Sequence, residues 1–160
     1  MQTMLQPAVS HASYTLERNY PASPERVFSF LSDPAKKRRW FGAGDNPATD
    51  SFAMDFRVGG RETKHFGTSL DSPLKGATLT NETVYMDIEP ARRVVFDYTM
   101  AVNGKHISAS LATFELIPDG AGTALLFTEQ AAFFENSDGP EGRKAGWSSL
   151  LDQLEKELKS

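Results

Sequence analysis

GWSSLLDQLEKELK, residues 146–159, is the segment that decides the fold. Its apolar side chains recur at positions i, i+3, i+4, i+7 and i+11, so they lie along one side of an α-helix. These side chains are Trp147, Leu150, Leu151, Leu154 and Leu158. A helix with such a stripe is unstable alone in water, and it must therefore pack on another element. Gly139-Pro140 begins this helix, which we expect to run almost to the last residue.

Seven segments upstream are predicted to be β-strands, because apolar, β-branched and aromatic residues alternate there with polar ones between turn signals. They are residues 13–20, 52–58, 61–67, 79–89, 93–102, 106–117 and 123–131. Asn103-Gly104 is the strongest hairpin signal, and Gly59-Gly60 and Pro118-Asp119-Gly120 predict two further turns. The strands after the first form a meander, which must curl as it twists.

Two short helices are predicted between the first strand and this meander. Ser23 is a favourable N-cap and Pro24 suits the first helical position, so one helix should run to about Ser32. Asp33-Pro34 begins a second helix, which should end near Gly42 because glycine is common just beyond a helix C-terminus.

This order of elements indicates an α+β fold of the helix-grip type. A curved antiparallel sheet of about seven strands, two short helices and a long C-terminal helix would enclose an apolar cavity. The length of 160 residues fits one domain, which is predicted to cover residues 13–160. Residues 1–12 lack the basic end and apolar centre of a signal peptide, and they are predicted to form a flexible leader.

The composition excludes several classes of protein. The absence of cysteine excludes disulfides and thiolate zinc sites and suits the cytoplasm. A net charge of −4 argues against nucleic acid as a partner. No apolar run reaches the ~20 residues that cross a bilayer, so no membrane partner is expected. Eleven phenylalanines, four tyrosines and two tryptophans must line a core or a pocket.

Alternation along the predicted strands selects candidate ligand-binding residues. Six aromatic side chains are predicted to form the wall of the cavity: Trp40, Phe56, Phe66, Phe114, Phe127 and Trp147. Three polar side chains are predicted to anchor the ligand: Tyr85, Tyr98 and Glu129. Glu129 should face inward, because it lies two residues from Phe127 on the same strand.

Other polar residues are weighed as candidates for chemistry. Glu62, His65 and Asp87 lie on predicted strands, and Asp87 should share a face with Tyr85. A buried carboxylate can act as a general acid or base, but a bond to a neighbouring residue is the favoured interpretation, so no catalytic residue is predicted. The histidines lack the spacing of metal ligands, and neither a metal nor a cofactor is expected. KKRR, residues 36–39, is interpreted as the solvated side of a short helix.

Six segments, taken in order, carry a resemblance to a known family. They are YPASPERVF (20–28), RWF (39–41), FRVGG (56–60), DIEPARRVVF (87–96), GT (122–123) and GWSSLL (146–151). The chain resembles the START/Bet v 1-like helix-grip superfamily, and within it bacterial proteins similar to the C-terminal domain of the activator of the Hsp90 ATPase. That superfamily includes ligand carriers, polyketide cyclases and co-chaperone domains, so the resemblance implies the fold and no single activity.

The favoured function is therefore binding of a small apolar or aromatic molecule by a cytoplasmic domain, as a monomer or homodimer. One alternative is an enzyme of the polyketide cyclase or hydrolase kind, with an acid–base residue in its pocket. The other is an interaction module that acts as a co-chaperone of an Hsp90-type ATPase. The sequence leaves the ligand and any reaction open.

Overall fold

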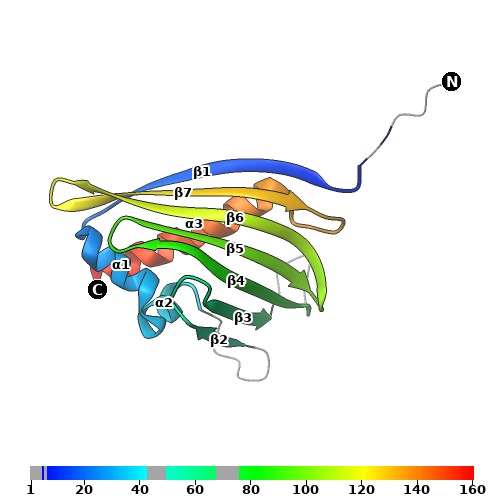
Figure 1. Ribbon diagram of the computed structural model, residues 1–160, viewed down its shortest axis with the longest axis horizontal. Helices are drawn as coiled ribbons and strands as arrows, with labels where there is room; N and C mark the ends of the chain where they lie inside the picture. The colour runs from blue at the N-terminus through cyan, green and yellow to red at the C-terminus, as the bar shows by residue number, and fades with distance from the viewer. Residues whose placement is uncertain (1–4, 6, 43–49, 68–75) are drawn as a thin grey trace.

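A seven-stranded antiparallel sheet forms the body of the protein, in the order β1-β7-β6-β5-β4-β3-β2. The computed structural model describes residues 5, 7–42, 50–67 and 76–160. Figure 1 shows the curvature of the sheet. The strands are β1 (Ser10–Tyr20), β2 (Ser51–Met54), β3 (Arg61–Gly67), β4 (Thr78–Glu89), β5 (Arg93–Val102), β6 (Lys105–Asp119) and β7 (Gly122–Phe133).

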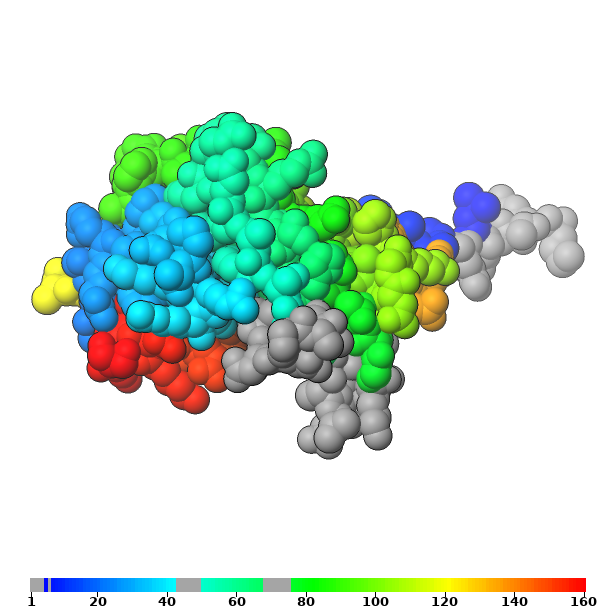
Figure 2. All heavy atoms as spheres, turned by 90° about the horizontal axis from the view of Figure 1, so that it is seen from below, coloured from blue at the N-terminus to red at the C-terminus, as the bar shows by residue number. Residues whose placement is uncertain are grey.

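Three helices complete the fold: α1 (Pro24–Ser32), α2 (Pro34–Trp40) and α3 (Gly139–Lys159). α3 lies along one face of the sheet, and α1 and α2 sit at one end of it (Figure 1). Seen from below, α1 and α2 lie beside the C-terminal part of α3 (Figure 2). This arrangement confirms the predicted α+β helix-grip fold. Among the described residues, no helix is long and apolar enough to cross a membrane.

The short helices begin where the capping residues predict. The Ser23 side chain accepts a hydrogen bond from the Arg26 backbone N–H at 3.2 Å, which satisfies a free donor of α1. The Asp33 carboxylate caps α2 in the same way, because it accepts a hydrogen bond from the Ala35 backbone N–H at 2.9 Å. The indole N–H of Trp40 then donates to the Phe30 carbonyl at 2.9 Å, which ties α2 back onto α1.

Several strand ends differ from the sequence prediction. β1 begins at Ser10, because residues 10–12 pair with the end of β7, so these residues belong to the sheet and not to a leader. Residues 1–4 and 6 of the predicted leader lie outside the described residues. β2 ends at Met54, because the chain then turns so tightly that a Cβ on Gly60 would lie 2.1 Å from the Asp55 carbonyl oxygen. β6 continues to Asp119, beyond its last pair with β5.

A β-bulge in β4 makes one prediction wrong. The register of β4 against β5 shifts between Tyr85 and Asp87, which breaks the two-residue alternation. Tyr85 is buried, whereas Asp87 forms an ion pair with Arg93 at 2.7 Å and Ile88 packs against the core. Tyr85 and Asp87 therefore do not share a face.

Leu151 supplies the first test of this packing. It is fully buried on α3, and its carbonyl accepts a hydrogen bond from the Tyr20 hydroxyl of β1 at 2.8 Å. Leu151→Ala should lower the free energy of unfolding by about 2–5 kcal/mol in urea titrations, because it leaves a cavity. Leu111→Ala, at an exposed position of β6, is the control and should change it little. A Leu151→Ala variant as stable as the wild type would contradict the packing of α3.

Candidate ligand-binding site

A pocket of about 250 Å³ lies between the first turns of α3 and the face of β3, β4 and β5. Its lining is mostly aromatic and aliphatic, with a few polar side chains. The lining residues are Phe41, Lys64, Phe66, Asn81, Tyr98, Met100, Asp138, Gly142, Arg143, Gly146, Trp147 and Leu150. Apolar hollows with few polar groups are typical of small-molecule sites.

Lys64 is the unusual group of this pocket. Its side chain is 6% exposed, and its ammonium lies 4.4 Å from the ring centroids of both Phe41 and Phe66. No hydrogen bond or ion pair reaches this ammonium from the described part of the chain. Burial lowers the pKa of Lys64 to about 8, with Glu62 opposing the shift and Lys37 adding to it.

Lys37 and Glu62 form a buried pair next to the pocket. The Lys37 ammonium lies 2.6 Å from the Glu62 carboxylate, which also accepts a hydrogen bond from the Tyr85 hydroxyl at 2.5 Å. Lys37 belongs to the basic run 36–39, so the interpretation of that run as a solvated face is wrong at this position. Burial, with the Glu62 charge second, raises the pKa of Tyr85, which keeps its hydroxyl protonated as a donor.

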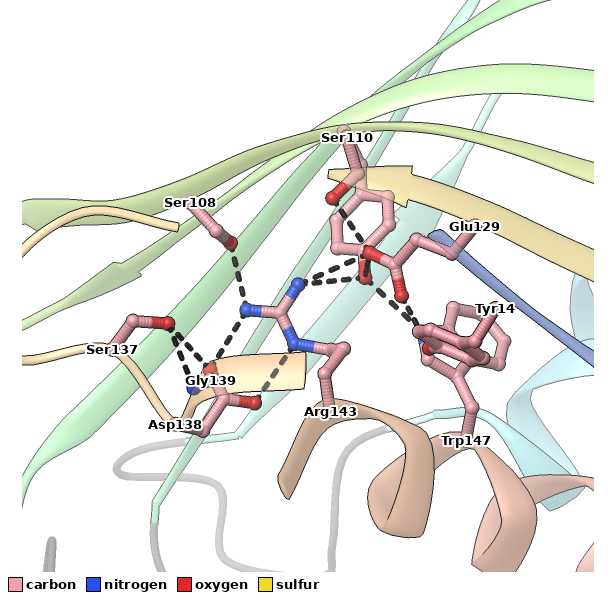
Figure 3. Close-up of polar contacts among 10 residues, drawn as sticks. Tyr14, Ser108, Ser110, Glu129, Ser137, Asp138, Gly139, Arg143 and Trp147 are labelled. Carbon is pink, nitrogen blue, oxygen red and sulfur yellow. Dashed lines mark hydrogen bonds and ion pairs between the residues drawn. The ribbon is translucent and has the colours of Figure 1, made fainter. Parts of the chain in front are cut away.

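Glu129 is the centre of a second buried network (Figure 3). Its side chain is fully buried, as the alternation with Phe127 predicts. The carboxylate accepts hydrogen bonds from the hydroxyls of Tyr98 at 2.5 Å and Ser110 at 2.6 Å, and from that of Tyr14. Burial and the Glu129 charge raise the pKa of Tyr14, so this hydroxyl stays a donor.

Arg143 enters this network from α3 (Figure 3). One terminal nitrogen lies 3.2 Å from the Glu129 carboxylate, and the other donates to the Ser108 hydroxyl at 2.7 Å. The Asp138 carboxylate accepts from Nε at 2.9 Å and from a terminal nitrogen at 3.0 Å. The guanidinium is thus held by two carboxylates, and it fixes the start of α3 against β6 and β7.

The structure brings three of the nine predicted site residues to the pocket: Phe66, Tyr98 and Trp147. The other six lie outside this lining: Trp40, Phe56, Tyr85, Phe114, Phe127 and Glu129. The reason is that Trp147 fills the middle of the hollow, with its ring centroid 4.3 Å from that of Phe127 and 6.0 Å from that of Phe114. The pocket therefore lies at one end of α3, beside these packed rings.

The remaining titratable candidates have local partners. His65 is hydrogen-bonded to the Thr80 hydroxyl at 3.0 Å, and Asp87 pairs with Arg93. Within the described ranges, no group of three or more His, Asp or Glu side chains is placed to hold a metal ion.

Sequence reasoning missed Lys64, Asn81 and Arg143 in the pocket. A signal for Lys64 was present, because strict alternation puts it on the same face as Phe66, which was predicted to face inward. Arg143 lies one helical turn before Trp147, on the same side of α3. Asn81 becomes recognisable only from the pairing of β3 with β4, where it lies directly opposite Lys64.

Comparisons with known proteins agree with this architecture. Mll3558 of Rhizobium loti is 42% identical, with 94% of this chain and 99% of that chain covered and a TM-score of 0.84. A protein of Rhizobium leguminosarum is 33% identical over 94% of this chain and 96% of its own, with a TM-score of 0.84. CV1439 of Chromobacterium violaceum, 23% identical over 92% and 97% with a TM-score of 0.72, shows the fold alone. No curated protein matches the chain.

The family model described as activator of Hsp90 ATPase homolog 1-like protein matches residues 21–159. This match covers every helix, and every strand from β2 onward. The chain therefore belongs to the family of activator of Hsp90 ATPase homolog 1-like proteins, within the START/Bet v 1-like helix-grip superfamily.

Proposed function

We propose that this protein binds a small apolar or aromatic molecule in the pocket between α3 and strands β3, β4 and β5. The observation that carries the proposal is the lining itself: the rings of Phe41, Phe66 and Trp147 and the side chains of Met100 and Leu150 face one hollow. Apolar walls of this kind favour burial of an apolar ligand.

Two alternative functions have less support. An acid–base enzyme needs a titratable group that can reach its substrate, but the Glu129 carboxylate is fully buried among its own partners and outside the pocket lining. A co-chaperone module needs a protein-binding surface, but the large exposed apolar side chains are scattered: Met86 lies on β4, Leu111 in the middle of β6 and Ile117 near the end of β6.

The test is binding of an anilinonaphthalene dye to the native protein. We expect saturable binding at about one site per chain, with a negative heat-capacity change because apolar surface is buried. Met100→Asp should weaken binding by about tenfold or more, since it puts a charge into the apolar wall. Met86→Asp is the matched control, because Met86 is exposed and outside the pocket, and it should bind as the wild type does.

Circular dichroism must show that both variants keep the native fold. Failure of the native protein to bind the dye would overturn the proposal. So would equal affinities of Met100→Asp and Met86→Asp, because the dye would then bind somewhere other than the pocket.

A further inference from the structure

We infer that the ligand of this pocket is an aromatic acid, whose carboxylate pairs with the Lys64 ammonium. This inference rests on the proposed pocket function and adds to it the chemical class of the ligand. Two side chains of the described structure share one small aromatic pocket: the buried Lys64, which has no hydrogen bond or ion pair there, and Asn81, whose buried amide oxygen has no hydrogen-bond partner there.

Lys37, Lys64 and Arg143 are buried cations in or next to the pocket. Lys37 is paired with Glu62, and Arg143 is paired with both Glu129 and Asp138. Lys64 is buried almost as deeply as these two, yet no carboxylate among the described residues lies within ion-pair distance of it. Burial of a charge is costly unless the charge is paired, so this position favours an anion supplied by a ligand.

The rings around Lys64 partly stabilise its ammonium when no anion is bound. Phe41 and Phe66 each present a ring centroid 4.4 Å from Nζ, and a ring face attracts a cation. This attraction is weaker than that of a carboxylate in a desolvated site, and it leaves the hydrogen-bond donors of the ammonium unused. The same rings would flank the aromatic body of a ligand whose carboxylate reached Lys64.

The amide oxygen of Asn81 supports the inference independently of Lys64. The Asn81 side chain is 8% exposed, and its Oδ1 is buried without a hydrogen-bond partner in the described structure. It lies directly opposite Lys64 in the β3–β4 register, and neighbouring Met100 lies opposite Asn81 in the β4–β5 register. One row across three strands therefore offers a donor, an acceptor and an apolar contact. A hydroxyl group on the ligand would donate to Asn81.

Charged and titratable groups around Lys64 lie on several elements of the fold. Glu62 on the same strand is engaged by Lys37 of α2 and by the Tyr85 hydroxyl. At the start of α3, Asp138 and Arg143 also line the pocket, but they are paired with each other. The remaining ionisable group in the lining is the Tyr98 phenol of β5, which burial keeps protonated by raising its pKa.

The ionisation of Lys64 gives the binding of an acid a defined pH dependence. The pKa of Lys64 in the free protein is about 8, and a bound carboxylate would raise it. Affinity for the acid should therefore be constant at pH 6–7, where Lys64 is already protonated. Above pH 8 it should fall by up to about tenfold per pH unit, because binding then requires proton uptake.

The experiment compares two probes of nearly equal shape, 4-hydroxybenzoate and 4-hydroxybenzamide, by calorimetry at pH 6.5. The wild type should bind the acid about tenfold or more tightly than the amide, since only the acid offers a charge-assisted bond. Lys64→Met should lose this preference and keep its affinity for the amide. Lys144→Met removes the same charge from an exposed position of α3, and it should bind both probes as the wild type does.

The outcomes separate this inference from the proposed function. Equal affinities of the wild type for both probes would overturn the inference and leave the pocket function intact. Binding of the dye without binding of either probe would also overturn the inference and leave the pocket function intact. A preference for the acid that persists in both Lys64→Met and Lys64→Gln would remove Lys64 as the anion partner. Absence of binding of the dye and of both probes would overturn the inference and the proposed function together.

Discussion

Replacement of Glu129 by leucine should lower the free energy of unfolding by about 3–5 kcal/mol, the range for removal of one partner from a buried ion pair. The carboxylate is fully buried, and it receives hydrogen bonds from three hydroxyls as well as from Arg143. After the substitution the three hydroxyls would lose this acceptor, and Arg143 would keep only the Asp138 carboxylate as an ionic partner. Since a domain of this kind is stable by only about 5–15 kcal/mol, such a loss is a large fraction of the total.

Urea unfolding followed by fluorescence would measure the loss. Glu129→Gln keeps one acceptor oxygen but no charge, so its cost should lie between that of the leucine variant and zero. Glu115→Gln, at an exposed position of the neighbouring strand β6, is the control and should stay within about 0.5 kcal/mol of the wild type. A Glu129→Leu variant that loses less than about 1 kcal/mol would show that the network contributes little to the fold.

A double variant can separate the ion pair from its surroundings. Arg143→Met alone should also destabilise the fold, because Glu129 and Asp138 would lose their shared cation. The double variant Glu129→Leu, Arg143→Met should cost less than the sum of the two single changes, since neither charge remains unpaired. An additive result would mean that the two side chains stabilise the fold independently.

The arrangement of elements was predictable because its signals are local. Asn103 and Gly104 both take positive φ angles, 50° and 83°, as a tight hairpin requires. The apolar stripe on α3 could be predicted from helical spacing alone, and the structure buries its residues Trp147, Leu151, Leu154 and Leu158. The bulge after Tyr85 was not predictable, since an extra residue in one strand depends on the pairing with its neighbour.

The pocket was only partly predictable, because it depends on how much space each side chain fills. Alternation correctly turned Phe127 and Glu129 inward, but it could not show that Trp147 would fill the space beside them. The role of Arg143 depends on Glu129 and Ser108, which lie on two strands far from it in sequence. The local pattern of α3 puts Arg143 on the same side as Trp147, but it does not identify these partners.

Trp147 itself gives the second large effect that we expect. It is buried among the rings of Phe41, Phe96, Phe114 and Phe127, and its indole N–H donates to the Tyr98 hydroxyl at 3.1 Å. Trp147→Ala should cost about 3–5 kcal/mol, because it removes these contacts and leaves a void. Trp147→Phe should cost less, since it keeps most of the volume and loses mainly the bond to Tyr98.

The void should also join the existing pocket, because Trp147 forms part of the pocket wall. An engineered apolar cavity in a protein core can take up a small aromatic molecule, so free indole should bind in the space that the side chain leaves. Indole should then raise the free energy of unfolding of Trp147→Ala more than that of Trp147→Phe or the wild type, because binding to the native state alone stabilises it. Equal effects of indole on all three proteins would show that the core collapses onto the missing ring, and that Trp147 does not limit the size of the pocket.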